Sequence, residues 1–181
     1  MIPALTPVER AALLGIARAA LRHRLAGGPP PTVPADGALG EPRGAFVTLR
    51  RGGDLRGCIG TLAPRGPLAA EVAHLAVAAA LDDPRFVPVG PEELDDLEIS
   101  ISVLGALRRL EDPLAIQIGR DGVVVQLGWQ RGTLLPRVAI EHGWSAEDLL
   151  RHTCLKAGLW PEAWKDPRAT VEVYSAEELN G

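Results

Sequence analysis

The amino-acid sequence predicts an α+β protein with mixed or antiparallel sheets and flanking helices. Two strand-like stretches, 44–50 and 55–62, are separated by Gly52-Gly53, a pair that favours a tight hairpin turn. Segments with helical periodicity lie between the strand-like segments in the order α-β-β-α-β-β-β-α-β. Hairpins and mixed connections of this kind are typical of α+β proteins and not of doubly wound sheets.

The first helix has a clear beginning and end. Thr6, Pro7 and Glu9 form a capping box with proline at the first helical position. Leucines and alanines then recur at helical spacing until Gly27-Gly28 ends the helix. Residues 27–37 contain four prolines between glycines, which predicts an extended linker on the surface.

The middle of the chain predicts a helix and then a strand. Residues 66–81 form an alanine-rich helical stretch, whose small side chains predict close packing on a sheet. A proline-rich crossing follows, and then a strand over 97–107 that alternates between two faces. One face is apolar and the other carries Glu98, Ser100 and Ser102.

The C-terminal part predicts further strands and one helix. Asp121-Gly122 reads as a turn before a strand, and residues 128–143 read as a glycine-bounded strand that breaks at Pro136. A helix begins after the N-cap Ser145 and ends before Gly158. A closing strand spans 169–175.

Composition limits the functional classes. The chain has 181 residues, 46% of them hydrophobic, which fits one domain over residues 1–181 or two small subdomains that share a core. The net charge is -4 and no basic block is present, which argues against a nucleic-acid binder. No signal peptide and no apolar run of ~18 residues is present. Two cysteines in a chain of this length do not form a disulfide framework, which favours a reducing compartment. Together these observations lead us to expect a soluble, cytoplasmic protein without membrane attachment.

Several motifs of cofactor sites are absent from the sequence. It contains no G-x-G-x-x-G after a strand, no P-loop, no C-x-x-C and no H-E-x-x-H. The four histidines lack metal-ligand spacing. The sequence therefore predicts neither a metal nor a cofactor.

The segment "DLRGCIGTL" (54–62) places a cysteine between two glycines. If Leu55 and Ile59 face the core, strand alternation puts Arg56 and Cys58 together on the other face, roughly 7 Å apart. A guanidinium at that distance would favour the thiolate form of Cys58. Because Gly57 and Gly60 have no side chains, they would then leave space for a ligand to reach the sulfur of Cys58.

A structural interpretation of the same segment stays open. Free cysteine is usually a small buried hydrophobe, and the glycines could mark a bulge or a tight strand crossing. Cys154 shares a helical stripe with Leu150 and Ala157, which predicts a core position for that second cysteine.

Other polar residues have both a functional and a structural interpretation. Asp83 and Arg85, in "DPRF", could form a charge pair in a binding cleft or belong to a proline turn in which Asp83 binds its own backbone. Glu98 could act as a general base or lie on a solvated strand face. His142 could relay protons or lie in a turn. Lys156 could be a ligand-binding cation or stabilise the end of its helix.

These residues carry a resemblance to a known family. "LRGCIGTL" (55–62) resembles the signature of the AMMECR family, and "DPRF" (83–86) and "ELDDLEISISVLG" (93–105) resemble its next two blocks. "GTLLPRVA" (132–139), "GWSAEDLLRHTCLKAGL" (143–159) and the tryptophan at 164 resemble its C-terminal blocks. The family usually carries glutamine where this chain has Arg137.

The resemblance implies a fold, a site and partners. It implies two intertwined subdomains with a cleft between them, and it puts the RGCIGT segment, from Arg56 through Thr61, at that cleft. It also implies an association with a Memo-type protein and a radical-SAM protein, the AmmeMemoRadiSam set. The family has no settled biochemical activity that could be carried over to this chain.

Two hypotheses of function follow. In the first, the protein is a thiol-dependent enzyme that acts on a small molecule or a protein side chain. Cys58 is then the nucleophile or a redox thiol, Arg56 tunes the thiol or binds an anion, and Glu98 or His142 is the base. In the second, the cleft is a non-catalytic docking site for a peptide or small ligand in the service of a companion enzyme.

Overall fold

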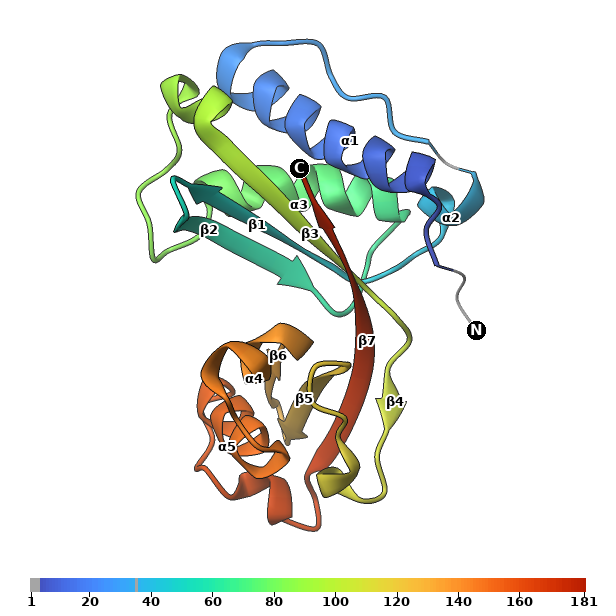
Figure 1. Cartoon of the computed structure of the whole chain (residues 1–181), viewed down its shortest axis with the longest axis vertical. Coiled ribbons are helices and arrows are strands. Elements are labelled where there is room, and N and C mark those ends of the chain that lie inside the picture. Colours follow the sequence, from blue (N-terminus) through green and yellow to red (C-terminus); the bar gives the residue numbers. More distant parts are fainter. Residues whose placement is uncertain (1–3, 35) are drawn as a thin grey trace. The chain divides into compact units, whose positions relative to one another are not determined.

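The computed structural model describes residues 4–34 and 36–181, and they form two compact units (Figure 1). Unit 1 contains the described residues up to Leu104 together with Glu177–Gly181, and unit 2 contains Gly105–Ala176. Each unit has its own cluster of buried apolar side chains. The last strand, β7 (Thr170–Asn180), begins in unit 2 and ends in unit 1, so it contributes to both.

Unit 1 is a sheet with helices on one face (Figure 1). Its strands pair in the antiparallel order β2-β1-β3, and β3 exchanges two backbone hydrogen bonds with the chain end, between Ile99 and Gly181. Its elements are α1 (Pro7–Ala26), α2 (Gly37–Gly40), β1 (Ala45–Arg51), β2 (Asp54–Thr61), α3 (Leu68–Leu81), the 3-10 helix η1 (Pro91–Asp96) and β3 (Leu97–Leu104).

The predicted beginning and end of the first helix are confirmed. The hydroxyl of Thr6 accepts a hydrogen bond from the Glu9 N–H, and the Glu9 carboxylate accepts one from the Thr6 N–H. Gly27 ends α1 in the left-handed region with φ 72°. Of the predicted linker 27–37, residues 27–34 and 36 are outside helices and strands, Ala35 lies outside the described residues, and Gly37 already begins α2.

The predicted hairpin is confirmed as β1 and β2. Gly52 and Gly53 adopt φ values of 58° and 85°, which side chains disfavour, so this turn requires glycine. The register contains an irregularity that the sequence did not predict. Leu49 pairs with Gly57 while Arg50 pairs with Leu55, so Arg56 is the extra residue of a β-bulge.

The two faces of the unit 1 sheet differ in polarity. Helices α1 and α3 pack on the face that carries the buried apolar side chains of β1 and β3, among them Val47, Leu49 and Ile101. The predicted alternation of β3 is confirmed, because Ile99 and Ile101 are buried in that core while Glu98 is exposed. We call the opposite face, which carries Thr48, Cys58, Ser100 and Ser102, the polar face.

Unit 2 is a second antiparallel arrangement with its own helices. Its strands pair in the order β4-β7-β5-β6. Its elements are β4 (Arg108–Arg109), the 3-10 helix η2 (Pro113–Ala115), β5 (Asp121–Leu127), β6 (Gln130–Leu134), α4 (Pro136–His142), α5 (Ala146–Lys156), the 3-10 helix η3 (Ala163–Lys165) and most of β7.

One prediction for unit 2 is incomplete and another is wrong. The strand predicted to break at Pro136 ends at Leu134, but Pro136 is also the first residue of helix α4, where the missing N–H of proline costs nothing. Asp121 and Gly122 belong to β5, and the chain turns before them at Gly119, which has a φ of 83°.

The helix predicted after Ser145 is confirmed as α5. Ser145 and Asp148 form a reciprocal capping box, and Gly158 follows the C-cap Ala157 with a φ of 74°. Cys154 on this helix is 0% exposed, which confirms its predicted core position. The prediction of an α+β fold is therefore correct, and all strand pairs described above are antiparallel.

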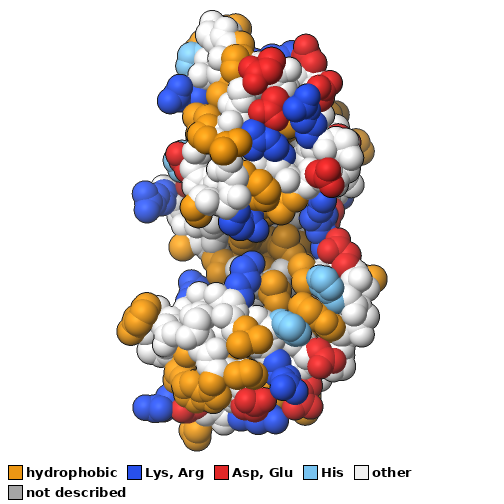
Figure 2. All heavy atoms as spheres, turned by 90° about the vertical axis from the view of Figure 1, so that its left-hand side faces the viewer, with side chains coloured by type: hydrophobic (Ala, Val, Ile, Leu, Met, Phe, Trp, Pro, Cys, Tyr) orange, Lys and Arg blue, Asp and Glu red, His pale blue; other side chains and the backbone are white. Residues whose placement is uncertain are grey.

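The surface charges are mixed in sign. On the face drawn in Figure 2, Lys and Arg side chains are interspersed with Asp and Glu side chains over both units. Ion pairs among the described residues include Arg51 with Asp96 and Arg151 with Glu162. Within the described part of the chain, every helix is too short or too polar to span a lipid bilayer.

Candidate functional site

Cys58 lies on the polar face of unit 1 in a row that crosses three strands. In the strand register Cys58 of β2 is opposite Thr48 of β1, which is opposite Ser100 of β3. Partners that are directly opposite project from the same face of a sheet. The row therefore sets a thiol beside two hydroxyls, on the face opposite helices α1 and α3.

The sulfur of Cys58 receives a hydrogen bond. The Thr48 hydroxyl donates to Cys58 Sγ over 3.2 Å, and Cys58 is a free, half-buried cysteine. Cys154 has the opposite environment, since it is enclosed by the apolar core of unit 2 and burial raises the pKa of its thiol. Of the two cysteines, Cys58 alone has a polar setting suited to chemistry.

The backbone of Cys58 is held from the side by Asp83 and Arg85, which we call the clamp. The Cys58 N–H donates to Asp83 Oδ2 over 2.9 Å, and Arg85 Nη2 lies 3.5 Å from the Cys58 carbonyl oxygen. Strand β2 is the outermost strand of the unit 1 order, so these backbone groups have no strand partner on that side. The clamp satisfies them and fixes the position of the cysteine.

The two clamp residues form a strong ion pair. Arg85 Nε and Nη2 lie 2.9 and 2.7 Å from Asp83 Oδ1 and Oδ2, a bidentate arrangement. Asp83 is 5% exposed, and the Arg85 guanidinium, assisted by the Cys58 N–H, holds the pKa of its carboxyl far below the usual range. Asp83 Oδ1 also accepts a bond from the Arg85 N–H, so "DPRF" contains both the predicted charge pair and the predicted local turn.

Removing the charge of Asp83 should loosen this arrangement. We expect Asp83→Asn to lower the free energy of unfolding by about 2 kcal/mol, below the ~3–5 kcal/mol of a fully buried pair because the Arg85 side chain is half exposed. We also expect faster hydrogen exchange at the Cys58 amide, measured by NMR. Arg168→Gln, which breaks the Asp166–Arg168 pair of unit 2, whose arginine side chain is 79% exposed, is the control and should leave that amide unchanged.

Arg56 lies elsewhere than the sequence predicted. Its guanidinium donates to both oxygens of Glu93, over 2.9 and 2.8 Å, and to the carbonyl oxygens of Val87 and Pro88. The bulge at Arg56 also reverses Leu55, which pairs with Arg50 and so shares a face with Cys58. The prediction that Leu55 and Ile59 share a core face is wrong for Leu55 and correct for Ile59, which packs on the core.

The space beside the Cα atoms of Gly57 and Gly60 is filled by other parts of the protein. A Cβ on Gly57 would come within 1.9 Å of the Ala79 carbonyl oxygen in α3, and one on Gly60 within 2.1 Å of the Phe46 ring. The space beside them therefore belongs to a helix and to an aromatic side chain, and the prediction that they leave room for a ligand is wrong. Both are needed for close packing.

Glu98 and Thr61 lie on β3 and β2 without contact to the sulfur of Cys58. Glu98 is exposed on the same sheet face, but two strand spacings and two residues along the strand separate its Cα from that of Cys58 by roughly 12 Å. The Thr61 hydroxyl donates to the Ala63 carbonyl and accepts from its N–H, which closes a local turn.

His142 and Lys156 belong to unit 2, so a meeting with Cys58 stays a prediction. His142 ends α4 and its ring stacks on Trp144 with centroids 4.6 Å apart, and Trp144 stacks on His152 at 3.8 Å. Lys156 is the exposed last residue of α5. Within the described ranges, no group of three or more His, Cys, Asp or Glu side chains is placed to hold a metal ion.

Sequence reasoning missed two residues of this site. Thr48 could have been found, because the alternation of side chains in "AFVTLR" puts it on the other face of the strand from Val47 and Leu49. That face is the polar side of the hairpin. Glu93 gave no local signal, because its partner Arg56 is 37 residues away and the two meet only in the folded chain.

The chain resembles proteins whose sequences and structures are known. A family model described as AMMECR1 matches residues 14–179. A protein of Methanothermobacter thermautotrophicus is 44% identical over 177 residues, covering 93% of this chain and 92% of that protein. Protein TK0174 of Thermococcus kodakarensis is 43% identical over 167 residues, covering 87% and 80%.

A solved structure has the same fold. The crystal structure of uncharacterized protein PH0010 from Pyrococcus horikoshii matches with a TM-score of 0.85 and 40% identity, over 92% of this chain and 88% of that one. The family model and the relatives each cover most of this chain, and the signature residues of "LRGCIGTL" form the clamped strand described above. The chain belongs to the AMMECR1 family.

Proposed function

We propose that this protein is a thiol-dependent enzyme in which Cys58 attacks an electrophilic atom of a small molecule or of a protein side chain. The observation that supports the proposal is the hydrogen bond from the Thr48 hydroxyl to Cys58 Sγ, at 3.2 Å. A donor aimed at the sulfur stabilises the negative charge of a thiolate, which is the nucleophilic form of cysteine.

The clamp supports the same function by fixing the nucleophile. Catalysis gains from a nucleophile whose position is set before the substrate binds. Asp83 and Arg85 hold both backbone polar groups of Cys58, and Gly57 packs directly on α3. The side chain of Cys58 therefore projects from a rigid strand and not from a mobile loop.

Alkylation with iodoacetamide tests the proposal. In the folded protein at pH 8 we expect Cys58 to react faster than the same cysteine in urea-unfolded protein, in a Cys154→Ser background. In the separate Cys58→Ser variant, Cys154 should react only after unfolding, because it is 0% exposed. If Cys58 reacts no faster when folded than when unfolded, the nucleophile assignment fails.

The role of Thr48 can be tested separately. Thr48→Val keeps the branched shape but removes the donor, and a hydrogen bond to a charged group is worth about 1.5 kcal/mol, so we expect about tenfold slower alkylation of Cys58. Thr133→Val makes the same chemical change in unit 2, where the hydroxyl bonds to Val123 and Tyr174, and should leave the rate unchanged. Equal rates in both variants would remove Thr48 from the mechanism.

A second candidate function is a non-catalytic accessory protein for a Memo-type protein and a radical-SAM protein. The engagement of Arg56 favours it, because four hydrogen bonds to Glu93, Val87 and Pro88 occupy the guanidinium that was expected to activate the thiol. The polar face would then be a docking surface.

Size-exclusion chromatography with the two purified partners from the same organism separates the candidates. An accessory protein should co-elute with at least one partner, and Ser100→Arg, which places a long side chain on the polar face, should abolish co-elution. Cys58→Ser should then keep co-elution. Separate elution of all three proteins would count against the accessory function.

A further inference from the structure

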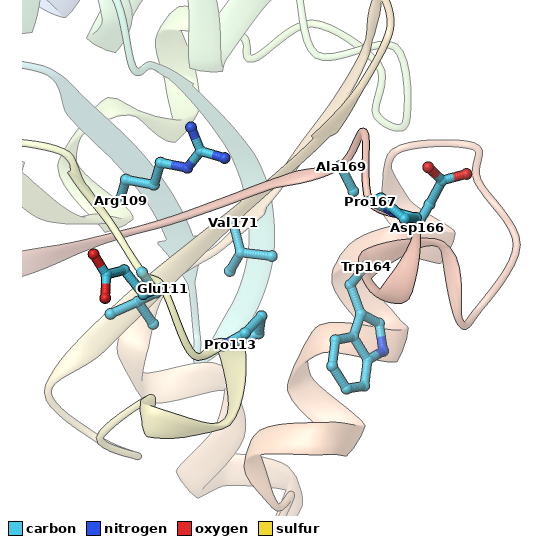
Figure 3. Close-up of a pocket in the computed structure, with 9 residues that line it drawn as sticks. Arg109, Glu111, Pro113, Trp164, Asp166, Pro167, Ala169 and Val171 are labelled. Carbon is cyan, nitrogen blue, oxygen red and sulfur yellow. The ribbon is translucent and has the colours of Figure 1, made fainter.

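A pocket of about 440 Å³ lies entirely within unit 2 (Figure 3). One wall is the segment from Arg109 to Pro113, and the other runs from Trp164 to Val171. The Leu110 N–H donates to the Val171 carbonyl oxygen over 3.0 Å, which ties the two walls together. A pocket of this size falls in the range of ~300–1,000 Å³ found for small-molecule sites.

The lining of the pocket combines apolar and charged residues: Leu110, Pro113, Trp164, Pro167, Ala169 and Val171 lie beside Arg109, Glu111 and Asp166. Val171 and the Trp164 indole are 4% and 9% exposed, and both belong to the core cluster of unit 2. Pro113 belongs to the wall that carries Arg109, and Val171 belongs to the wall that carries Trp164 (Figure 3). An aromatic or branched aliphatic group would bury apolar surface against them.

The charge of Asp166 on one wall is already paired within the chain. Asp166 accepts bonds from Arg168 Nε and Nη2 over 3.0 and 2.8 Å, and this pairing lowers the pKa of its carboxyl to about 2. The Ala169 N–H donates to the Asp166 carbonyl oxygen over 2.8 Å, so Pro167 lies within a closed turn. In Figure 3 the Asp166 carboxylate points away from Val171, which leaves that wall without a free charge at the pocket.

The opposite wall has a cation available. Among residues 4–34 and 36–181, Arg109 has neither a hydrogen-bond nor an ion-pair partner for its guanidinium, although it lines the pocket. Glu111 lines the same wall, but its carboxylate points away from Val171 in Figure 3. A guanidinium beside the apolar side chains of a pocket with a mixed lining is suited to bind a carboxylate through two parallel N–H···O bonds.

We propose that this pocket binds a small monocarboxylate with an aromatic or branched aliphatic body. Arg109 holds the carboxylate, and the body lies between Pro113, Val171 and the Trp164 indole. The pocket is lined by residues of unit 2 alone and the argument uses none of the residues around Cys58 in unit 1, so the proposal can be tested independently of the proposed thiol chemistry.

Saturation-transfer NMR on the full chain tests the proposal with two matched probes, 3-phenylpropionate and its neutral amide, 3-phenylpropionamide. We expect the carboxylate to bind at least about tenfold more tightly than the amide, since only it can form charge-assisted bonds. The position of binding is read from the Trp164 Nε1–H signal, assigned with Trp164→Phe. This buried group has no hydrogen-bond partner within the described chain, and it should shift on adding the carboxylate.

Two arginine variants complete the test. Arg109→Gln should remove the preference for the carboxylate, whereas Arg108→Gln, which changes the neighbouring exposed arginine outside the pocket lining, should keep it. The proposal is overturned by any of three results. These are an absence of saturation transfer, equal affinity for acid and amide, or an unchanged preference in Arg109→Gln.

Discussion

Gly57→Ala is expected to lower the free energy of unfolding by about 3 kcal/mol, at the upper end of the cost of overpacking. A methyl group at this position would lie 1.9 Å from the Ala79 carbonyl oxygen and 3.0 Å from its carbonyl carbon. Both atoms belong to the backbone of α3, so no side chain can rotate to make room. Either the helix or the edge strand must move.

Urea denaturation measures this effect, and α1 supplies the control. Gly15 has open space around its hypothetical Cβ, so Gly15→Ala should raise stability by about 0.5–1 kcal/mol through helix propensity alone. If Gly57→Ala and Gly15→Ala have equal free energies of unfolding, the close packing of β2 on α3 does not exclude a side chain at position 57. A loss of stability in Gly57→Ala should be accompanied by slower alkylation of Cys58, if strand rigidity supports its reactivity.

Glu93→Gln is expected to lower the free energy of unfolding by about 3 kcal/mol at pH 7, and by much less in acid. Glu93 is mostly buried, accepts two bonds from Arg56, and has a pKa lowered to about 2 chiefly by those bonds. A carboxyl whose folded pKa is lowered stabilises the protein above its unfolded pKa of 4.5, and this contribution is lost as the pH falls toward 2.

Urea denaturation at a series of pH values between 7 and 2.5 checks both parts of this expectation. The difference between the wild-type protein and Glu93→Gln should be constant above about pH 5 and shrink steadily below about pH 4.5. Glu92→Gln, an exposed neighbour in η1, is the control and should stay within about 0.5 kcal/mol of the wild type. A difference that does not change with pH would show that the Arg56–Glu93 pair is not the source of the stability.

Local sequence signals predicted much of the fold. The capping box at Thr6, the N-cap at Ser145, the glycine turn at 52–53 and the alternation in β3 all depend on residues within a few positions of one another. Helix α4 was missed because a proline after a strand is equally consistent with a break and with the first residue of a helix.

The candidate site was predicted only in part. The sequence pointed to Cys58, Asp83 and Arg85, and the folded chain brings these three together. It misplaced Leu55 because a single extra residue in β2 reverses the alternation that the prediction assumed. The roles assigned to Glu98, His142 and Lys156 stay predictions.

The sequence by itself determined the α+β class, the hairpin that carries Cys58, and the core position of Cys154, because each depends on local pattern and turn chemistry. Only the tertiary structure decided what surrounds Cys58. Arg56 turns to Glu93, 37 residues away, and Asp83 reaches the Cys58 amide from 25 residues away. Charged and hydrogen-bonding groups find their best partners when the chain is folded, and spacing along a single strand cannot show which distant group will be nearest.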